Sequence, residues 1–201
     1  IKLCGEDTRV LKVSYAGEKG FEIHVHNNSM KKIYDELVQH GENFNLIHFG
    51  MLALDSMRLE KNYRSWKSDL TSDYTMLQSG LEKWIKFDKG NFIGKEALKN
   101  EFDLGTSKKF VTLVVDDPED NKPFGEPVYL SPVFAGDDYL GPIVSSGYGH
   151  RVKKSISMAI LDDRNLNGLN DQLYIDVLGR KRKAYIVNEA LYDPENLKLR
   201  S

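Results

Sequence analysis

The change of pattern near residue 105 constrains the fold of this chain more than any other feature of its sequence. From Gly105-Thr-Ser onward no segment has the apolar periodicity of a good helix, whereas short apolar runs alternate with turn signals such as Ala135-Gly-Asp-Asp and Leu178-Gly. The runs that predict strands are residues 110–115, 127–130, 143–148, 156–161, 172–178 and 184–188. Six short strands at this spacing predict a small all-β barrel or sandwich.

The half of the chain before residue 105 mixes strands and helices. Residues 10–16 and 20–26 predict a hairpin with a short turn, and Phe21, Ile23 and Val25 alternate with polar residues, so that they would share a core face. The elements predicted after this hairpin are a helix with Ser29 as N-cap and Gly41 at its end, a strand over 43–49, a helix after Gly50, a strand over 83–87 and a helix from about Gly94. The sequence therefore predicts an α+β protein, with a ferredoxin-like unit over residues 1–105 and an all-β barrel over residues 106–201.

Residues 50–66, GMLALDSMRLEKNYRSW, predict a central helix and the loop that leaves it. Asp55 and Arg58 are three positions apart, so they can pair along the helix. Asn62 stands where the helix is expected to end, and asparagine adopts the left-handed conformation of a C-terminal cap at little cost.

An aromatic and cationic cluster follows this helix. Tyr63, Arg64 and Trp66 present flat rings and one positive charge, which suit a flat aromatic or anionic ligand. The alternative is a buried Trp66 that closes the core beneath a loop, and this stretch alone favours that simpler interpretation.

Length, charge and cysteine content narrow the class of protein. With 201 residues and a formal net charge of -2, the chain fits one large or two small domains and does not resemble a nucleic-acid binder. No apolar run approaches a membrane span, and the single cysteine, Cys4, indicates a reducing compartment such as the cytoplasm. The chain begins at Ile1 and enters a strand pattern almost at once, so we interpret it as a piece of a longer protein.

Two residues of the predicted hairpin form a candidate ligand site. Tyr15 and Glu22 are expected to face each other, or nearly so, across its turn. A carboxylate can accept both hydrogen bonds from the adjacent N–H and NH2 groups of a pterin, and an aromatic ring can cover the flat face. The simpler interpretation, a solvent-facing glutamate and a tyrosine packed on the sheet, is favoured by these residues alone.

Other polar groups give weaker signals. Glu22, His24 and His26 share one strand face and are a possible metal set, although two histidines on an exposed strand are common. The glycines of residues 147–151 favour a barrel corner, and the basic run of residues 179–183 favours a solvated hairpin tip over a polyanion site. The sequence contains no dinucleotide-binding fingerprint after a strand, no P-loop and no nucleophile elbow.

Taken together, several stretches resemble the aminomethyltransferase (glycine-cleavage T-protein) family. They are SYAGEKGFE (14–22), ALDSMRLEK (53–61), KGNFIGKEAL (89–98) and SGYGH (146–150), and they follow one another in the family's order. Residues 62–66 and 191–196 are more similar to the C-terminal part of dimethylglycine and sarcosine dehydrogenases. Leu54 stands where the T-protein carries an arginine, which also favours the dehydrogenase branch.

The resemblance implies a ferredoxin-like part plus a C-terminal β-barrel, with tetrahydrofolate bound in a central channel. The family's pterin-binding tyrosine and glutamate fall on Tyr15 and Glu22, and Arg64 and Trp66 are expected to close the pocket. The implied function is transfer of a one-carbon unit from an oxidised N-methylated amine to tetrahydrofolate. The alternative is a non-catalytic folate-binding or assembly module.

The resemblance also implies that this chain works with a further part of its parent protein. The family's catalytic aspartate lies in an N-terminal segment that these residues do not contain, and FAD would be held only in a domain preceding Ile1. We therefore expect no catalytic residue in this chain, no turnover by the chain alone, and the N-terminal part of the parent as its partner. The loose spacing of Glu22, His24 and His26 separately leads us to expect no metal.

Overall fold

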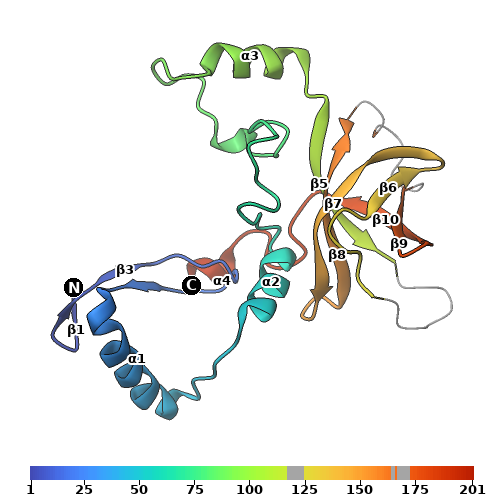
Figure 1. The fold of residues 1–201 in the computed structure, drawn as a ribbon. Helices are drawn as coiled ribbons and strands as arrows, with labels where there is room; N and C mark the ends of the chain where they lie inside the picture. The colour runs from blue at the N-terminus through green and yellow to red at the C-terminus, as the bar shows by residue number, and fades with distance from the viewer. Residues whose placement is uncertain (117–124, 164–165, 167–172) are drawn as a thin grey trace.

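The computed structural model describes residues 1–116, 125–163, 166 and 173–201. Its second half is a closed β-barrel of antiparallel neighbours (Figure 1). The strands, in their order around the barrel, are β10 (Arg180–Val187), β5 (Lys108–Val115), β8 (Lys154–Asp162), β7 (Asp138–Gly149), β6 (Pro132–Ala135) and β9 (Leu173–Val177). The predicted barrel is therefore confirmed.

One of the predicted barrel strands is wrong. Residues 127–130 form no strand: the backbone N–H of Ser131 donates to the carbonyl of Val128 over 2.9 Å, which closes a turn over 128–131, and Leu130 has a φ of 68°. The chain extends only from Pro132, where β6 begins. The other five predictions coincide with β5, β7, β8, β9 and β10, although Gln172, the first residue of one prediction, lies outside the described residues.

Apolar side chains pack on both sides of the barrel wall. The interior cluster includes Leu113, Val133, Ile143, Leu161 and Ile175. Because side chains alternate along a strand, the intervening residues point outward, and those of β5, β7 and β8 would meet water if nothing covered them. The central helix α2 (Met51–Glu60) packs on this side of the wall, where its Leu59 belongs to one buried cluster with Phe110, Val144, Ile156, Met158 and Ile160.

The glycines of residues 147–151 allow α2 to approach the barrel closely. A Cβ atom on Gly149 would lie 2.9 Å from Cγ of Glu60, and one on Gly147 would lie 3.0 Å from Cδ1 of Leu59. The hydroxyl of Ser56 donates to the carbonyl of Tyr148 over 2.6 Å, which fixes the helix along the strand. The glycines that favoured a barrel corner in the sequence therefore allow a close helix–strand contact.

Gly141 gives a direct test of the barrel packing. A Cβ atom there would lie 2.1 Å from the carbonyl oxygen of Ile160 on the neighbouring strand. We expect Gly141→Ala to lower the free energy of unfolding by about 3 kcal/mol or more, because a backbone atom cannot move aside as a flexible side chain can. Gly136→Ala is the matched control. A Cβ atom at Gly136 would meet nothing within 4 Å, so this variant carries only the penalty of placing alanine at a positive φ. Equal losses in urea denaturation of the two variants would contradict the described β7–β8 contact.

The first half of the chain mixes helices with short strands, as predicted, but its sheets are small. The described strands pair as β1 (Lys2–Leu3) with β2 (Glu6–Asp7) and as β3 (Arg9–Leu11) with β4 (Glu22–His24). The helices besides α2 are α1 (Asn27–Gly41), α3 (Lys95–Leu104) and the 3-10 turns η1 (Glu42–Phe44) and η2 (Glu82–Trp84). Figure 1 shows α1 and α3 on separate arms that extend away from the barrel.

The predicted strands over 43–49 and 83–87 are wrong. In the first segment the N–H of Leu46 donates back to the carbonyl of Gly41 over 3.0 Å. In the second, the N–H groups of Trp84 and Ile85 donate to carbonyls three residues earlier. Local bonds thus occupy backbone groups that a strand would offer to a neighbour, and the sheet of a complete ferredoxin-like unit does not form among the described residues.

The ends of the helices are partly as predicted. α1 ends at Gly41 and α3 begins at Lys95, after Gly94, both as expected. The N-cap of α1 is His26, whose ring nitrogen accepts the N–H of Asn28, so the prediction of Ser29 is wrong. The hydroxyl of Ser29 instead donates to Glu6 over 2.7 Å. The division of the chain into domains at residue 105 stays a prediction.

Apolar side chains of the hairpin and α1 are exposed. Phe21 and Ile23, which were predicted to face a core, lie open, and so do Met30, Tyr34 and Leu37 along one stripe of α1. The prediction of a core face on this hairpin is therefore wrong for the described residues. No helix among the described residues is both long enough and apolar enough to span a membrane.

Candidate functional site

Tyr15 lies in the loop of the hairpin and not opposite Glu22. The register of β3 and β4 pairs Leu11 with Glu22, and residues 12–21 form the loop between the strands. The predicted cross-strand pairing of Tyr15 with Glu22 is therefore wrong, because the strands stop earlier than the apolar pattern suggested.

The structure instead joins Tyr15 to the loop that follows α2. Its hydroxyl donates to the carbonyl of Arg64 over 3.0 Å. Its ring stacks on Tyr63, with ring centres 6.2 Å apart and planes inclined by 16°. Burial raises the pKa of both the Tyr15 and the Tyr63 hydroxyl, so both rings stay neutral at ordinary pH. The hairpin loop and the loop after α2, which are distant in sequence, thus form one aromatic pair, Tyr15 and Tyr63.

Glu22 presents an open carboxylate at the end of the same loop. Its side chain is 57% exposed, and its described partner is the ring of His24, with Nε2 3.2 Å from Oε2. A carboxylate has about four acceptor positions, so most of its capacity remains available to a ligand. His26 caps α1, and no group of three histidine, cysteine, aspartate or glutamate side chains suited to a metal ion occurs in the described part of the chain.

The Arg64 guanidinium is held between a ring and a glycine. Its Cζ lies 4.2 Å from the centre of the Phe110 ring, and a Cβ on Gly80 would lie 2.7 Å from its Nη2. Burial lowers its pKa below the usual range, and its Nε has no hydrogen-bond partner among the described residues. A fixed, partly desolvated cation of this kind favours an anionic group.

Trp66 does not close the core. Its side chain is 74% exposed, so the prediction of a buried Trp66 beneath a loop is wrong. The ring is available for contact with another molecule or segment. The backbone around it is fixed by a bridge between Trp66 and Leu70. The exposed ring and the Arg64 cation lie two positions apart on one loop.

A buried ionic network beneath this loop was only partly predicted. Arg58 Nε donates to Asp55 over 2.7 Å, which confirms the expected pair. The C-cap of α2 is Lys61, and Asn62, the residue after it, has the expected left-handed conformation with a φ of 57°. The stronger partner is Asp69, whose Oδ2 lies 2.6 Å from Arg58 Nη1. The sequence drew no attention to Asp69, because its loop has no periodic pattern from which its neighbours follow.

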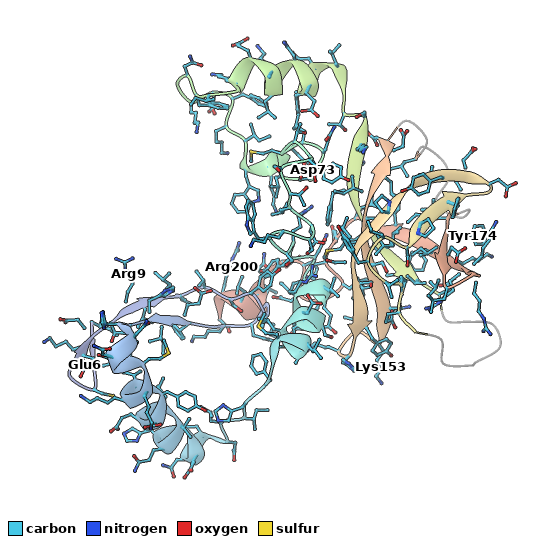
Figure 2. All side chains as sticks on the ribbon, viewed as in Figure 1. Glu6, Arg9, Asp73, Lys153, Tyr174 and Arg200 are labelled. Carbon is cyan, nitrogen blue, oxygen red and sulfur yellow. The ribbon has the colours of Figure 1, made fainter. Side chains whose placement is uncertain are left out.

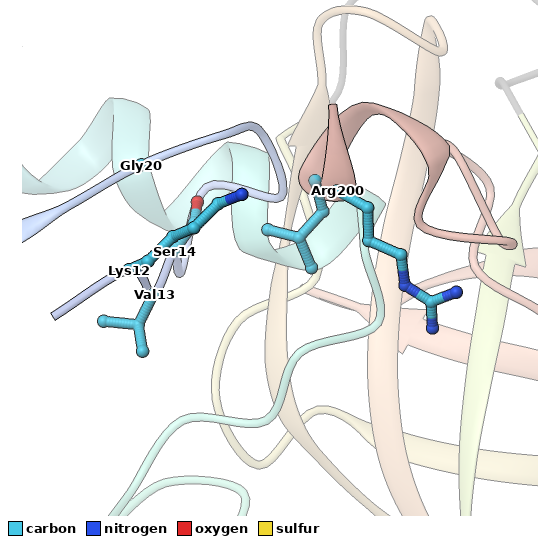
Figure 3. Close-up of a pocket in the computed structure, with 6 residues that line it drawn as sticks. Lys12, Val13, Ser14, Gly20 and Arg200 are labelled. Carbon is cyan, nitrogen blue, oxygen red and sulfur yellow. The ribbon is translucent and has the colours of Figure 1, made fainter.

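A cavity of about 420 Å³ lies between the hairpin and the C-terminal helix α4 (Leu197–Arg200) (Figure 3). Its lining residues are Lys12, Val13, Ser14, Gly20, Leu199 and Arg200. Figure 2 shows Arg200 close to the hairpin, although the two segments stand near opposite ends of the chain. The sequence pattern predicted neither α4 nor this cavity. The lining residues flank Tyr15 on both sides, so the cavity adjoins the aromatic pair's loop.

This architecture defines a class of protein: a mixed helix–strand half whose central helix packs on a closed barrel. The model of the GCVT N-terminal domain matches residues 1–89, and that of the glycine cleavage T-protein C-terminal barrel domain matches residues 108–193. The chain belongs to the aminomethyltransferase (glycine-cleavage T-protein) family. Folate binding and one-carbon transfer are general properties of this family.

Named relatives fall in both branches that the sequence suggested. An aminomethyltransferase of Thermoanaerobacter sp. (strain X514) is 30% identical over 192 residues, which are 96% of this chain and 50% of that protein. The mitochondrial dimethylglycine dehydrogenase of Homo sapiens is 29% identical, over 95% of this chain and 22% of that protein. The chain thus spans half or less of the length of these relatives.

A solved structure supports the fold. The glycine cleavage system aminomethyltransferase T from Bartonella henselae superimposes with a TM-score of 0.78 at 19% sequence identity, over 92% of this chain and 50% of that one. At 19% sequence identity, this structural similarity shows the fold alone.

Proposed function

We propose that this chain is the tetrahydrofolate-binding region of a protein that passes a one-carbon unit from an oxidised N-methylated amine to tetrahydrofolate. Family membership supports the class of ligand. The observation that carries the proposal is the hairpin itself, which holds the Tyr15 ring on Tyr63 and leaves the Glu22 carboxylate open at the end of the same loop.

The side chains present fit the chemistry of a folate. Glu22 supplies the bidentate acceptor that the pterin's adjacent donors need. Tyr15 and the exposed Trp66 supply flat apolar faces, and Arg64 supplies a cation for an anionic group. When bound, tetrahydrofolate supplies the nucleophilic nitrogen that accepts the one-carbon unit. In this proposal, the residues of this chain bind and orient it.

The amine-oxidising chemistry would belong to another part of the same protein. We propose that FAD is held there, and that the N-terminal part of the parent is the partner of this chain. The exposed side chains of Phe21, Ile23 and the α1 stripe support this, because apolar surface of this extent normally lies against another surface. A reducing compartment such as the cytoplasm is proposed from the single cysteine, Cys4, which is exposed.

Tyr15 provides the test of this proposal. In the whole protein we expect Tyr15→Leu to weaken binding of 5-formyltetrahydrofolate by about fivefold, since an aromatic contact contributes about 1 kcal/mol. Tyr15→Phe keeps the ring and is expected to retain most of the affinity. Tyr174→Leu, on β9 of the barrel, is the matched control for loss of a tyrosine (Figure 2).

Isothermal titration calorimetry distinguishes the outcomes. Equal affinities for Tyr15→Leu and Tyr174→Leu would contradict the assignment of the hairpin. Folate binding without one-carbon transfer by the whole protein would favour the alternative, a non-catalytic folate-binding or assembly module.

A further inference from the structure

Lys61 is a buried lysine whose ammonium group holds a segment from the other end of the chain. Its side chain is 1% exposed. The Nζ atom donates to the carbonyl of Asp193 over 2.6 Å, to its carboxylate over 3.2 Å and to the side-chain oxygen of Asn196 over 2.8 Å. These contacts match the three donors of an ammonium group, so its full capacity is directed at the C-terminal segment, residues 191–200.

The stem of the same lysine supports the hairpin loop. Gly17 is buried with a φ of 79°, and a Cβ atom there would lie 2.1 Å from Cγ of Lys61. Only glycine lets the loop rest on the stem this closely. The next residue, Glu18, accepts the hydroxyl of Tyr192 over 2.6 Å, so the loop also contacts the C-terminal segment directly.

Lys61 also touches the aromatic pair of the proposed folate site. Its Nζ lies 5.8 Å from the centre of the Tyr63 ring, and Tyr63 stacks on Tyr15. One side chain therefore contacts the hairpin loop, the aromatic pair and the C-terminal segment, which are far apart in sequence.

The C-terminal segment is shaped to receive this lysine and to form a wall of the cavity. Asp193 and Asn196 have left-handed φ values of 44° and 59°. The Asp193 carboxylate also accepts the N–H of Leu197 over 2.8 Å at the start of α4. Leu199 and Arg200 of α4 then line the cavity opposite the hairpin, and Figure 3 shows the Lys12 side chain directed toward α4.

We propose that Lys61 is a positioning residue for the folate site. It locks the C-terminal segment against the hairpin loop, so that the Tyr15–Tyr63 pair and the cavity between the hairpin and α4 keep their shape. This inference rests on the proposed function for the identity of the ligand, and it makes residues 191–200 part of the site.

The test uses Lys61→Met, which keeps an apolar stem beneath Gly17 and removes the ammonium group. Asp193→Asn, which keeps the shape of the acceptor, serves if Lys61→Met does not fold. Val177→Ala is the control for general destabilisation, because Val177 is buried in the barrel interior and belongs to neither the hairpin nor the C-terminal segment. All proteins are compared at a temperature at which each is folded.

Two measurements are made on these variants. In hydroxyl-radical footprinting of the whole protein, we expect oxidation of Tyr15 and Tyr63 to rise in Lys61→Met and to stay at the wild-type level in Val177→Ala. In titrations of the whole protein with 5-formyltetrahydrofolate, we expect Lys61→Met to lose affinity by about fivefold, because residues in direct contact are usually coupled by about 1 kcal/mol. We expect Val177→Ala to lose none.

The outcomes separate this inference from the proposed function. If the wild-type protein binds folate and Lys61→Met binds it equally well, the positioning role is overturned and the proposed function stands. If the wild-type protein binds no folate, the proposed function is overturned, and the footprinting alone decides whether Lys61 fixes the aromatic pair. Unchanged oxidation of Tyr15 and Tyr63 in Lys61→Met overturns the inference in either case.

Discussion

Replacing Arg58 by alanine is expected to lower the free energy of unfolding by about 3–5 kcal/mol, the usual result of removing one partner of a buried ion pair. The side chains of Arg58 and Asp69 are 3% and 0% exposed, and their closest atoms lie 2.6 Å apart. Without Arg58, the Asp69 carboxylate would remain buried and uncompensated. Urea denaturation of the variant and the wild type measures this difference.

Arg58 also joins parts of the fold that are distant in sequence. Its Nη2 donates to the hydroxyl of Ser145 on β7 over 2.9 Å, and Ser145 in turn donates to Asp69. The N–H of Ser65 donates to Asp69 over 2.7 Å. The network thus fastens the loop after α2 to the barrel, so its loss is expected to lower the stability of the whole folded unit.

Asp55→Ala is the matched control for the Arg58 variant. It removes the other carboxylate that binds Arg58, but the Asp55 side chain is 49% exposed, so we expect a loss of only about 1 kcal/mol or less. We expect folate affinity to be unchanged in Arg58→Ala wherever the protein is folded. Weaker folate binding by an equally stable Arg58→Ala protein would show that Arg58 is a ligand residue and not a structural one.

Replacing Glu22 by glutamine is expected to weaken tetrahydrofolate binding by the whole protein about tenfold or more. A glutamine keeps the shape of glutamate but offers one acceptor and one donor, so one of its N–H groups would face an N–H of the pterin. A charged hydrogen bond contributes about 1.5–3 kcal/mol, which sets the size of the effect.

The fold should tolerate this change at Glu22. Its side chain lies mostly in solvent, and its described partner is the equally exposed His24. We therefore expect Glu22→Gln to melt within a few degrees of the wild type, and thermal denaturation followed by circular dichroism checks this. A large loss of stability would mean that reduced folate binding reflects unfolding of the hairpin.

The barrel and the central helix could be predicted because local pattern and tertiary environment agree there. Alternating residues such as Val111 and Leu113 are both apolar and buried, and the Leu178-Gly turn signal coincides with the β9–β10 connection. The basic run of residues 179–183 was predicted to be a solvated tip, yet Arg182 is buried and donates to the carbonyl of Asp116. Because side chains alternate along a strand, Arg182 lies on the buried side of β10 although it belongs to the basic run.

The first half of the chain was less predictable, since its apolar residues lack the partners that their pattern implies. Phe21 and Ile23 alternate as a core strand does, yet they lie exposed. A strand forms only where a neighbour takes its backbone bonds, and the segments at 43–49 and 83–87 satisfy theirs locally. The apolar pattern of a segment shows which of its side chains could be buried. Whether they are buried depends on tertiary contacts, which the pattern does not specify.

The candidate site was predictable in its residue types and not in its geometry. Tyr15 and Glu22 were identified from chemistry and from the family resemblance, but the contact of Tyr15 with Tyr63 depends on how the hairpin loop meets the end of α2. Lys61 gave no signal beyond its place on the helix, because its partners Asp193 and Asn196 stand more than 130 residues away. Contacts of such separation follow from the fold alone.

Calorimetric titration of the whole protein with tetrahydrofolate, as wild type and as Glu22→Gln, tests the central claim most directly. We expect saturable binding by the wild type and affinity reduced about tenfold or more in the variant, with melting temperatures that stay close. Equal affinity of the two proteins would contradict the assignment of Glu22 as the pterin acceptor, and absence of binding by the wild type would contradict the proposed function itself.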